Sequence, residues 1–296
     1  MALYPKEWTT SGELLIDEPF RIGRIERSLE TMTEYAPQRA MGTIDMHRGS
    51  RAFRYGIMPA MASLKDLERR IIRCTRCPRL TAYRQAIART KVKRFATWDY
   101  WGKPVPGFGD PRARLLVVGL APAAHGGNRT GRIFTGDRSG DWLYEALYRY
   151  GFANQPHSVH RNDGMRLKDC YITAAVRCAP PGNKPLKEEF DACRPYLREE
   201  LQLLRRLRVV VALGKIAFDE YLKANRELGH NLPPERKPLF GHGIQVELPW
   251  GITLLGSYHP SQQNTFTGKL TRRMFHDVFA RARALLDAVE SHSTFD

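Results

Sequence analysis

Apolar residues along the chain form short continuous runs that alternate with longer stretches of helical periodicity. The runs are bounded by Gly and Pro, are typical of strands buried on both faces, and cover residues 114–120, 171–176, 209–213 and 252–256. Helical stretches lie near residues 139–151, 187–206, 215–226 and 270–290, and an earlier one follows Ser63, which is placed to cap it. Buried strands separated by helices predict an α/β fold with a parallel sheet covered on both faces.

The first 60 residues differ from the rest of the chain. They contain eight Lys and Arg against eight Asp and Glu, and they lack any long periodic stretch. We therefore expect residues 1–60 to form a partly disordered N-terminal extension and residues 61–296 to form a single domain.

The net charge narrows the choice of partner. Lys and Arg number 47 against 31 Asp and Glu, a balance of +16 that falls entirely on residues 61–296. This excess favours nucleic acid over an anionic membrane surface. No run approaches the roughly 18 apolar residues of a membrane span, and no apolar segment near the N-terminus indicates a secretory signal. We expect a cytoplasmic protein, associated with the nucleoid if it is bacterial, and no feature of the sequence indicates more than a monomer.

Four of the five cysteines form two pairs. Cys74 and Cys77 are separated by two residues, and Cys178 and Cys193 by fourteen. Two such pairs brought together by folding suit a tetrahedral zinc ion or an iron–sulfur cluster, and spacing does not distinguish the two. The alternative is a set of free buried thiols. Cys170 opens a strand without a partner and is expected to be a core thiol.

Two loops at predicted strand ends carry unusual residues, and ligands bind at such ends in parallel sheets. The loop of residues 119–137 is rich in glycine but has neither a P-loop nor a dinucleotide fingerprint. In it, Phe134 either stacks on a nucleobase or packs under the loop. In the loop of residues 257–264, Pro260 fixes His259, which is either structural or directed at a ligand.

Three motifs together resemble the uracil-DNA glycosylase superfamily. They are GLAPAAHGGNRTGRIFTGD, VRCAPPGNKP and YHPSQQN, and the likeness is greatest to the type-5 branch over residues 64–290. The resemblance implies an α/β/α sandwich around a four-stranded parallel sheet. It also implies a 4Fe–4S cluster on Cys74, Cys77, Cys178 and Cys193, and hydrolytic removal of uracil from double-stranded DNA after the nucleotide flips out of the stack.

The resemblance also assigns roles to single residues. Phe134 matches the aromatic residue that stacks on the flipped base, and His259 matches the histidine that contacts a base oxygen. Ser261 and Gln262 belong to the loop that enters the minor groove. The backbone between Gly119 and Ala121 is expected to donate N–H groups to the base, where developing negative charge needs donors.

Two departures from other branches affect the chemistry. Leu120 and Ala121 stand where relatives carry an acidic residue that positions water, which leaves Asn128 and Asp137 as candidates for that task. Asp137 is equally suited to cap the helix that follows it.

Ala174 stands where many relatives have an Asn that reads uracil. We therefore expect looser selectivity that extends to hypoxanthine and modified cytosines. The alternative function is a non-catalytic iron–sulfur protein that binds DNA and senses damage or redox state.

Overall fold

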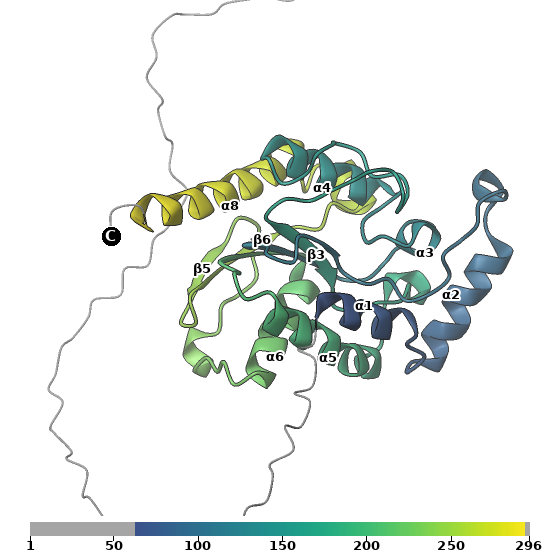
Figure 1. Ribbon diagram of the computed structural model, residues 1–296, viewed down its shortest axis with the longest axis horizontal. Coiled ribbons are helices and arrows are strands. Elements are labelled where there is room, and N and C mark those ends of the chain that lie inside the picture. The colour runs from purple at the N-terminus through teal and green to yellow at the C-terminus, as the bar shows by residue number, and fades with distance from the viewer. Residues whose placement is uncertain (1–62, 294–296) are drawn as a thin grey trace, which may run out of the picture. The chain divides into compact units, whose positions relative to one another are not determined.

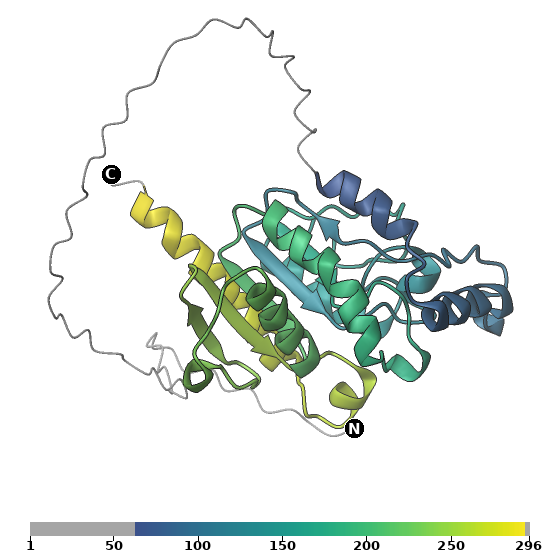
Figure 2. The ribbon, with the colours of Figure 1, turned by 90° about the horizontal axis from the view of Figure 1, so that it is seen from below.

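The computed structural model describes residues 63–293, which are built around one six-stranded sheet (Figures 1 and 2). The strands are arranged in the order β1-β3-β2-β4-β6-β5. The central four pair in parallel and comprise β3 (Cys170–Ala174), β2 (Leu115–Gly119), β4 (Val209–Leu213) and β6 (Ile252–Ser257). Their register pairs Gly119 with Ala174 and Leu213 with Ser257, so the carboxyl ends of these strands meet at one edge.

The α/β class and the four parallel strands are confirmed, but the sheet is mixed and larger than predicted. Two antiparallel edge strands were missed: β1 (Phe108–Gly109) beside β3, and β5 (Gln245–Leu248) beside β6. An edge strand is only partly covered, so it lacks the continuous apolar run that marks a buried strand. β1 has two residues, and β5 begins at a glutamine. The predicted extension of residues 1–60 lies outside the described residues.

Helices cover both faces of the sheet. α4 (Arg138–Arg149) and α8 (Arg272–Ser293) lie along one face, while α5 (Lys187–Leu203) and α6 (Lys215–Glu227) lie along the other, with α1 (Leu64–Ile72) against α5 (Figure 1). Alternate residues of β2 serve the two faces, because successive side chains of a strand point in opposite directions. Leu115 and Val117 join the core under α4 and α8, whereas Leu116 and Val118 join the core under α6.

Several helices and turns were not predicted from the hydrophobic pattern. α2 (Pro78–Thr90) has proline in its first turn, where no N–H partner is needed. The remainder are α3 (Gly127–Thr130), α7 (Gln262–Phe266) and the 3₁₀ turns η1 (Lys93–Phe95), η2 (Pro181–Asn183) and η3 (Pro234–Arg236). Most contain too few residues to develop helical periodicity. No helix in the described part of the chain is both long and apolar enough to cross a membrane.

A buried ion pair ties the end of β3 to α5. Arg177 and Glu200 are both fully buried, and Arg177 Nη2 lies 2.6 Å from Glu200 Oε2. The Thr173 hydroxyl donates to the same carboxylate oxygen at 2.6 Å, and Arg177 Nη1 also donates to that hydroxyl. Removing one partner of such a pair leaves an unpaired charge in the core.

Glu200→Gln is therefore expected to lower the free energy of unfolding by about 3–5 kcal/mol. Glu199→Gln is the matched control, since the neighbouring residue makes a largely exposed pair with Arg70 and should cost at most about 1 kcal/mol. Denaturant unfolding of both variants measures the difference. Equal destabilisation by the two substitutions would contradict the role given to the buried pair.

Candidate active site and cysteine cluster

Phe134, His259 and Gly119 meet at the carboxyl edge of the sheet. The Phe134 and His259 rings have centroids 5.8 Å apart and are tilted by 31°. Gly119 ends β2 directly beneath the Phe134 ring, and a Cβ at this position would lie 2.6 Å from Phe134 Cε2. Only glycine lets the ring approach the strand end so closely. The structure thus brings together three residues that are spread over 140 positions of the chain.

Phe134 has an unusual backbone conformation. Its φ of 53° lies in the left-handed region, which bulky residues rarely adopt. Its carbonyl also packs against Gly140 in α4, where a Cβ would come within 1.8 Å of the oxygen. Such conformations persist where the surrounding structure enforces them, and they concentrate at functional sites. Although Phe134 is only 6% exposed, its strained backbone and its contact with His259 distinguish it from an ordinary core residue.

Hydrogen bonds hold the loop that carries His259. Asn264 Nδ2 donates to the His259 carbonyl at 2.9 Å, and the Ser261 hydroxyl caps α7 by accepting from the Asn264 N–H. Burial lowers the pKa of His259 to about 4, so its ring is neutral near pH 7. Beyond it, Gln262 and Phe266 are exposed, with Phe266 at 67%. The loop therefore offers a neutral imidazole beside polar and aromatic groups open to solvent.

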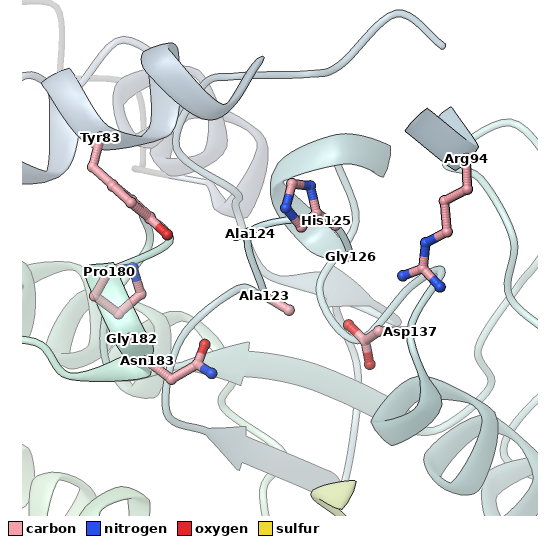
Figure 3. Close-up of a pocket in the computed structure, with 10 residues that line it drawn as sticks. All are labelled: Tyr83, Arg94, Ala123, Ala124, His125, Gly126, Asp137, Pro180, Gly182 and Asn183. Atoms are coloured by element: carbon pink, nitrogen blue, oxygen red, sulfur yellow. The ribbon is translucent and has the colours of Figure 1, made fainter. Parts of the chain in front are cut away.

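A cleft of about 270 Å³ lies beside the glycine-rich segment (Figure 3), and neither Phe134 nor His259 is among the residues that line it. Residues from α2, η1, the segment 123–126 and the η2 turn line it together with Asp137. The full lining is Tyr83, Arg94, Ala123, Ala124, His125, Gly126, Asp137, Pro180, Gly182 and Asn183. In Figure 3 the side chains of Asp137 and Asn183 lie on opposite sides of Ala123. A carboxylate, an amide and a guanidinium thus share one small concave space.

The structure is compatible with both roles considered for Asp137, namely capping α4 and positioning water. Its Oδ1 accepts from the Gly140 N–H at 3.0 Å and caps α4. Its other oxygen faces Gly126, where a Cβ would come within 2.0 Å of it. Burial raises the pKa of this carboxyl, and the Gly140 N–H partly offsets that rise. Capping therefore occupies one oxygen and leaves the other at the cleft.

The four paired cysteines converge on one small core. Cys178 and Cys193 are buried in it, and Cys74 and Cys77 pack against it. Burial raises the pKa of Cys178 to about 12 and that of Cys193 to about 11, and the neighbouring thiols add to both shifts. Cys170 lies apart in β3 and is fully buried in the main core, as predicted for a core thiol.

The spacing of these four cysteines allows two metal groups, a zinc ion or an iron–sulfur cluster. Among residues 63–293, no three His, Cys, Asp or Glu side chains are grouped so as to hold a metal ion. A tetrahedral zinc site with Zn–S bonds of about 2.3 Å needs sulfur atoms about 4 Å apart. An iron–sulfur cluster places iron and sulfide between its ligands and so holds four thiolates farther apart. Four thiols are a donor set for both groups, so the residues present fit an iron–sulfur cluster and do not exclude zinc.

Comparison with known proteins places the chain in a family. Residues 106–283 match the uracil DNA glycosylase superfamily. A type-5 uracil-DNA glycosylase of Mycobacterium bovis is 52% identical over 75% of this chain and 82% of its own length. The type-5 enzyme of Thermus thermophilus is 51% identical over 72% and 93%, whereas a type-4 enzyme of Pyrobaculum aerophilum is 31% identical over 67% and 83%. The chain belongs to the type-5 uracil-DNA glycosylases.

The remaining predicted site residues of this type-5 chain lie around the same edge. Ala174 ends β3 next to Gly119 and is 1% exposed. Ala121 is half-buried and packs against the cysteine core. Asn128 is buried in α3, with its Nδ2 donating to the Arg84 carbonyl at 3.2 Å, and it does not line the cleft. Its proposed catalytic role stays a prediction, which this placement does not favour.

Several cleft residues were missed by the sequence analysis. Tyr83 and Arg94 come from a helix and a 3₁₀ turn that are remote in sequence from the recognised motifs. His125 lies within the glycine-rich motif, and its Nδ1 is 3.0 Å from the Tyr100 hydroxyl. No periodicity or spacing marks these residues, because the cleft forms only where α2, η1 and the segment 123–126 meet in the folded chain.

The lowered pKa of His259 predicts a pH dependence of stability. The unfolded chain protonates this residue as the pH falls through about 6.5, but the folded state does so only near 4, so folding loses stability in that interval. At pH 5 the loss is about 2 kcal/mol relative to neutral pH.

Urea unfolding at about pH 7.5 and about pH 5, on either side of an ordinary His pKa, measures this loss. His259→Gln is the control, because it removes the titrating ring and should lose less stability on acidification. Equal losses in the two proteins would show that the ring titrates normally.

Proposed function

We propose that the protein excises uracil from DNA by hydrolysing the N-glycosidic bond, leaving an abasic site. The observation that carries this proposal is the Phe134–His259 pair, held at the carboxyl edge of a parallel sheet in a type-5 chain. A base inside a duplex is out of reach of these residues, so the nucleotide must first flip out of the stack. The printed names of the type-5 relatives, which are uracil-DNA glycosylases, support the same reaction.

Base recognition is assigned to the strand ends. Phe134 stacks on the flipped base, and Gly119 and Ala121 give their backbone N–H groups access to it. Cleavage of the C1′–N bond leaves negative charge on the base. The neutral imidazole of His259 donates an N–H to a base oxygen and stabilises that charge. A neutral donor suffices here, because what matters is a preorganised dipole directed at the developing anion.

Asp137 is the group that we propose to orient the attacking water. Its capping oxygen is held by Gly140, and its second oxygen faces the cleft. The water oxygen adds to C1′ as the bond to the base breaks, and the released proton balances the charge on the departing base. A carboxylate that accepts a hydrogen bond from water fixes its direction of attack.

Substrate range follows from what stands beside Gly119. Ala174 has no side-chain amide that could form hydrogen bonds with the edge of uracil. A different base therefore leaves no buried amide unpaired, and the pocket does not reject it on that ground. We therefore propose that hypoxanthine and modified cytosines are also released, from double-stranded DNA. Ser261 and Gln262 contact the minor groove, with the exposed cations Arg138, Lys269 and Arg273 available to phosphates.

We also propose that Cys74, Cys77, Cys178 and Cys193 ligate a 4Fe–4S cluster. The shared core and the all-thiol donor set support this assignment. Four cysteine ligands saturate such a cluster, so its contribution is structural: it joins the α1–α2 connection to the segment that leads from β3 into η2. The protein is proposed to act as a cytoplasmic monomer.

A single-turnover assay tests the function. Labelled duplexes carry one uracil, hypoxanthine or thymine, and alkali then cleaves any abasic site. Release of uracil and hypoxanthine, with thymine left intact, is expected. Uracil release alone would contradict the wide substrate range, and Ala174→Asn should reproduce that narrower pattern. No abasic product from any duplex, together with intact DNA binding, would replace the glycosylase by the non-catalytic DNA-binding alternative.

Asp137→Asn separates the two roles of that residue. Asparagine caps helices as well as aspartate does, so the free energy of unfolding should change by less than about 0.5 kcal/mol. The single-turnover rate should nevertheless fall by about a hundredfold, the scale of losing one acid–base group. Asp137→Ala, which also loses the cap, should cost about 1 kcal/mol more stability. An Asn variant with wild-type turnover would remove Asp137 from the mechanism.

A further inference from the structure

Arg84 is a buried cation whose charge the hydrolysis reaction does not use. It lies in α2 and is 3% exposed. Its Nη1 donates to the Gly102 carbonyl at 2.5 Å, and its Nη2 donates to the Cys74 carbonyl at 3.3 Å and approaches the Thr81 hydroxyl at 3.5 Å. Its Nε is buried and has no hydrogen-bond partner within the described residues. Every partner of this guanidinium is therefore neutral, and one donor is unused.

Other buried arginines show what Arg84 lacks. Arg132 pairs with Asp163, Arg177 with Glu200, and Arg194 with Glu220. Arg129 also lacks a carboxylate, but its guanidinium lies 3.7 Å from the Phe95 ring centroid and 4.1 Å from that of Trp98. Between residues 63 and 293, Arg84 has neither an acidic partner nor an aromatic face. An uncompensated buried charge is expensive, so an anion beside Arg84 would stabilise the folded protein.

Among the described residues, the paired cysteines are a concentration of potential negative charge next to Arg84. Its Nη2 donates to the Cys74 carbonyl, which places the guanidinium against the backbone of one of these cysteines. Four thiolates outweigh the positive charge of an iron–sulfur core, so the liganded cluster is an anion. We propose that Arg84 is the counter-ion of this cluster, with Nε as a donor toward its sulfur atoms. The inference rests on the proposed cluster.

Hydrogen bonds with Asn128 and Gly102 also hold Arg84, and they fix the position of its charge. Asn128 Nδ2 in α3 donates to the Arg84 carbonyl, and the Gly102 N–H donates to the Asn128 carbonyl at 3.0 Å. Gly102 in turn accepts from the Arg84 side chain. Asn128 thus acts as a positioning residue that joins the glycine-rich active-site loop to the counter-ion.

The test compares Arg84→Gln with Arg89→Gln in the protein as purified with its cluster. Arg89 lies on the same helix and is exposed, so its substitution removes the same charge from solvent. A nearby positive charge stabilises the reduced, more negative cluster, so its loss makes reduction harder. Arg84→Gln should lower the reduction potential by at least about 59 mV, a tenfold change in a one-electron equilibrium. Arg89→Gln should leave it unchanged. Electrochemical titration monitored by electron paramagnetic resonance measures both.

A normal iron content and an unchanged potential in Arg84→Gln would overturn the proposal. If Arg84→Gln fails to fold, Arg84→Lys decides: a retained charge should keep the iron content and potential near wild type. If folded Arg84→Lys loses its iron, a positive charge at this position is not sufficient to retain the cluster. The guanidinium would then have a purely structural role, and the counter-ion proposal would be overturned. Wild-type protein without iron would remove both the cluster and this inference, while base release would still support the proposed reaction.

Discussion

Parallel pairing of β3, β2, β4 and β6 is the constraint on which the rest of the structure depends. Parallel strands that pair in register end at the same edge of the sheet, and the loops that leave them must meet there. This geometry brings Phe134 and His259 into contact and places Ala174 beside Gly119. The two packed cores on opposite faces hold the strands in place, so the site is built on a rigid support.

Close packing at the end of β2 gives the site its shape. Gly119 admits the Phe134 ring, and Gly140 admits the Phe134 carbonyl, so a bulky residue is held in a backbone conformation that it would otherwise avoid. Asp137 follows three residues later and is fixed by the same helix start. The aromatic residue and the carboxylate are therefore positioned by one short segment, whose glycines are a steric requirement.

Two buried arginines connect elements of the domain outside the Phe134–His259 site. The Arg177–Glu200 pair closes the junction between β3 and α5 with its charges balanced. Arg84 lies unbalanced near the cysteines and also joins α2 to α3. The cysteine core and the active-site loop are thus linked through one helix. The hydrogen bonds of Arg84, Gly102 and Asn128 connect the cysteines to the loop, and the packing of Ala121 against the cysteine core is a second connection.

The sequence by itself determined the α/β class, the four central strands and most of the long helices, because continuous apolar runs and helical periodicity record burial directly. It also marked the cysteines, Phe134, His259 and Asp137, which lie in compact motifs. The tertiary structure alone decided the edge strands, whose partial exposure leaves a weak pattern. It alone placed Tyr83 and Arg94 at the cleft, Asn128 away from it, and Arg84 beside the cysteines without a carboxylate. These facts depend on contacts between segments far apart along the chain, and local pattern carries no record of such contacts.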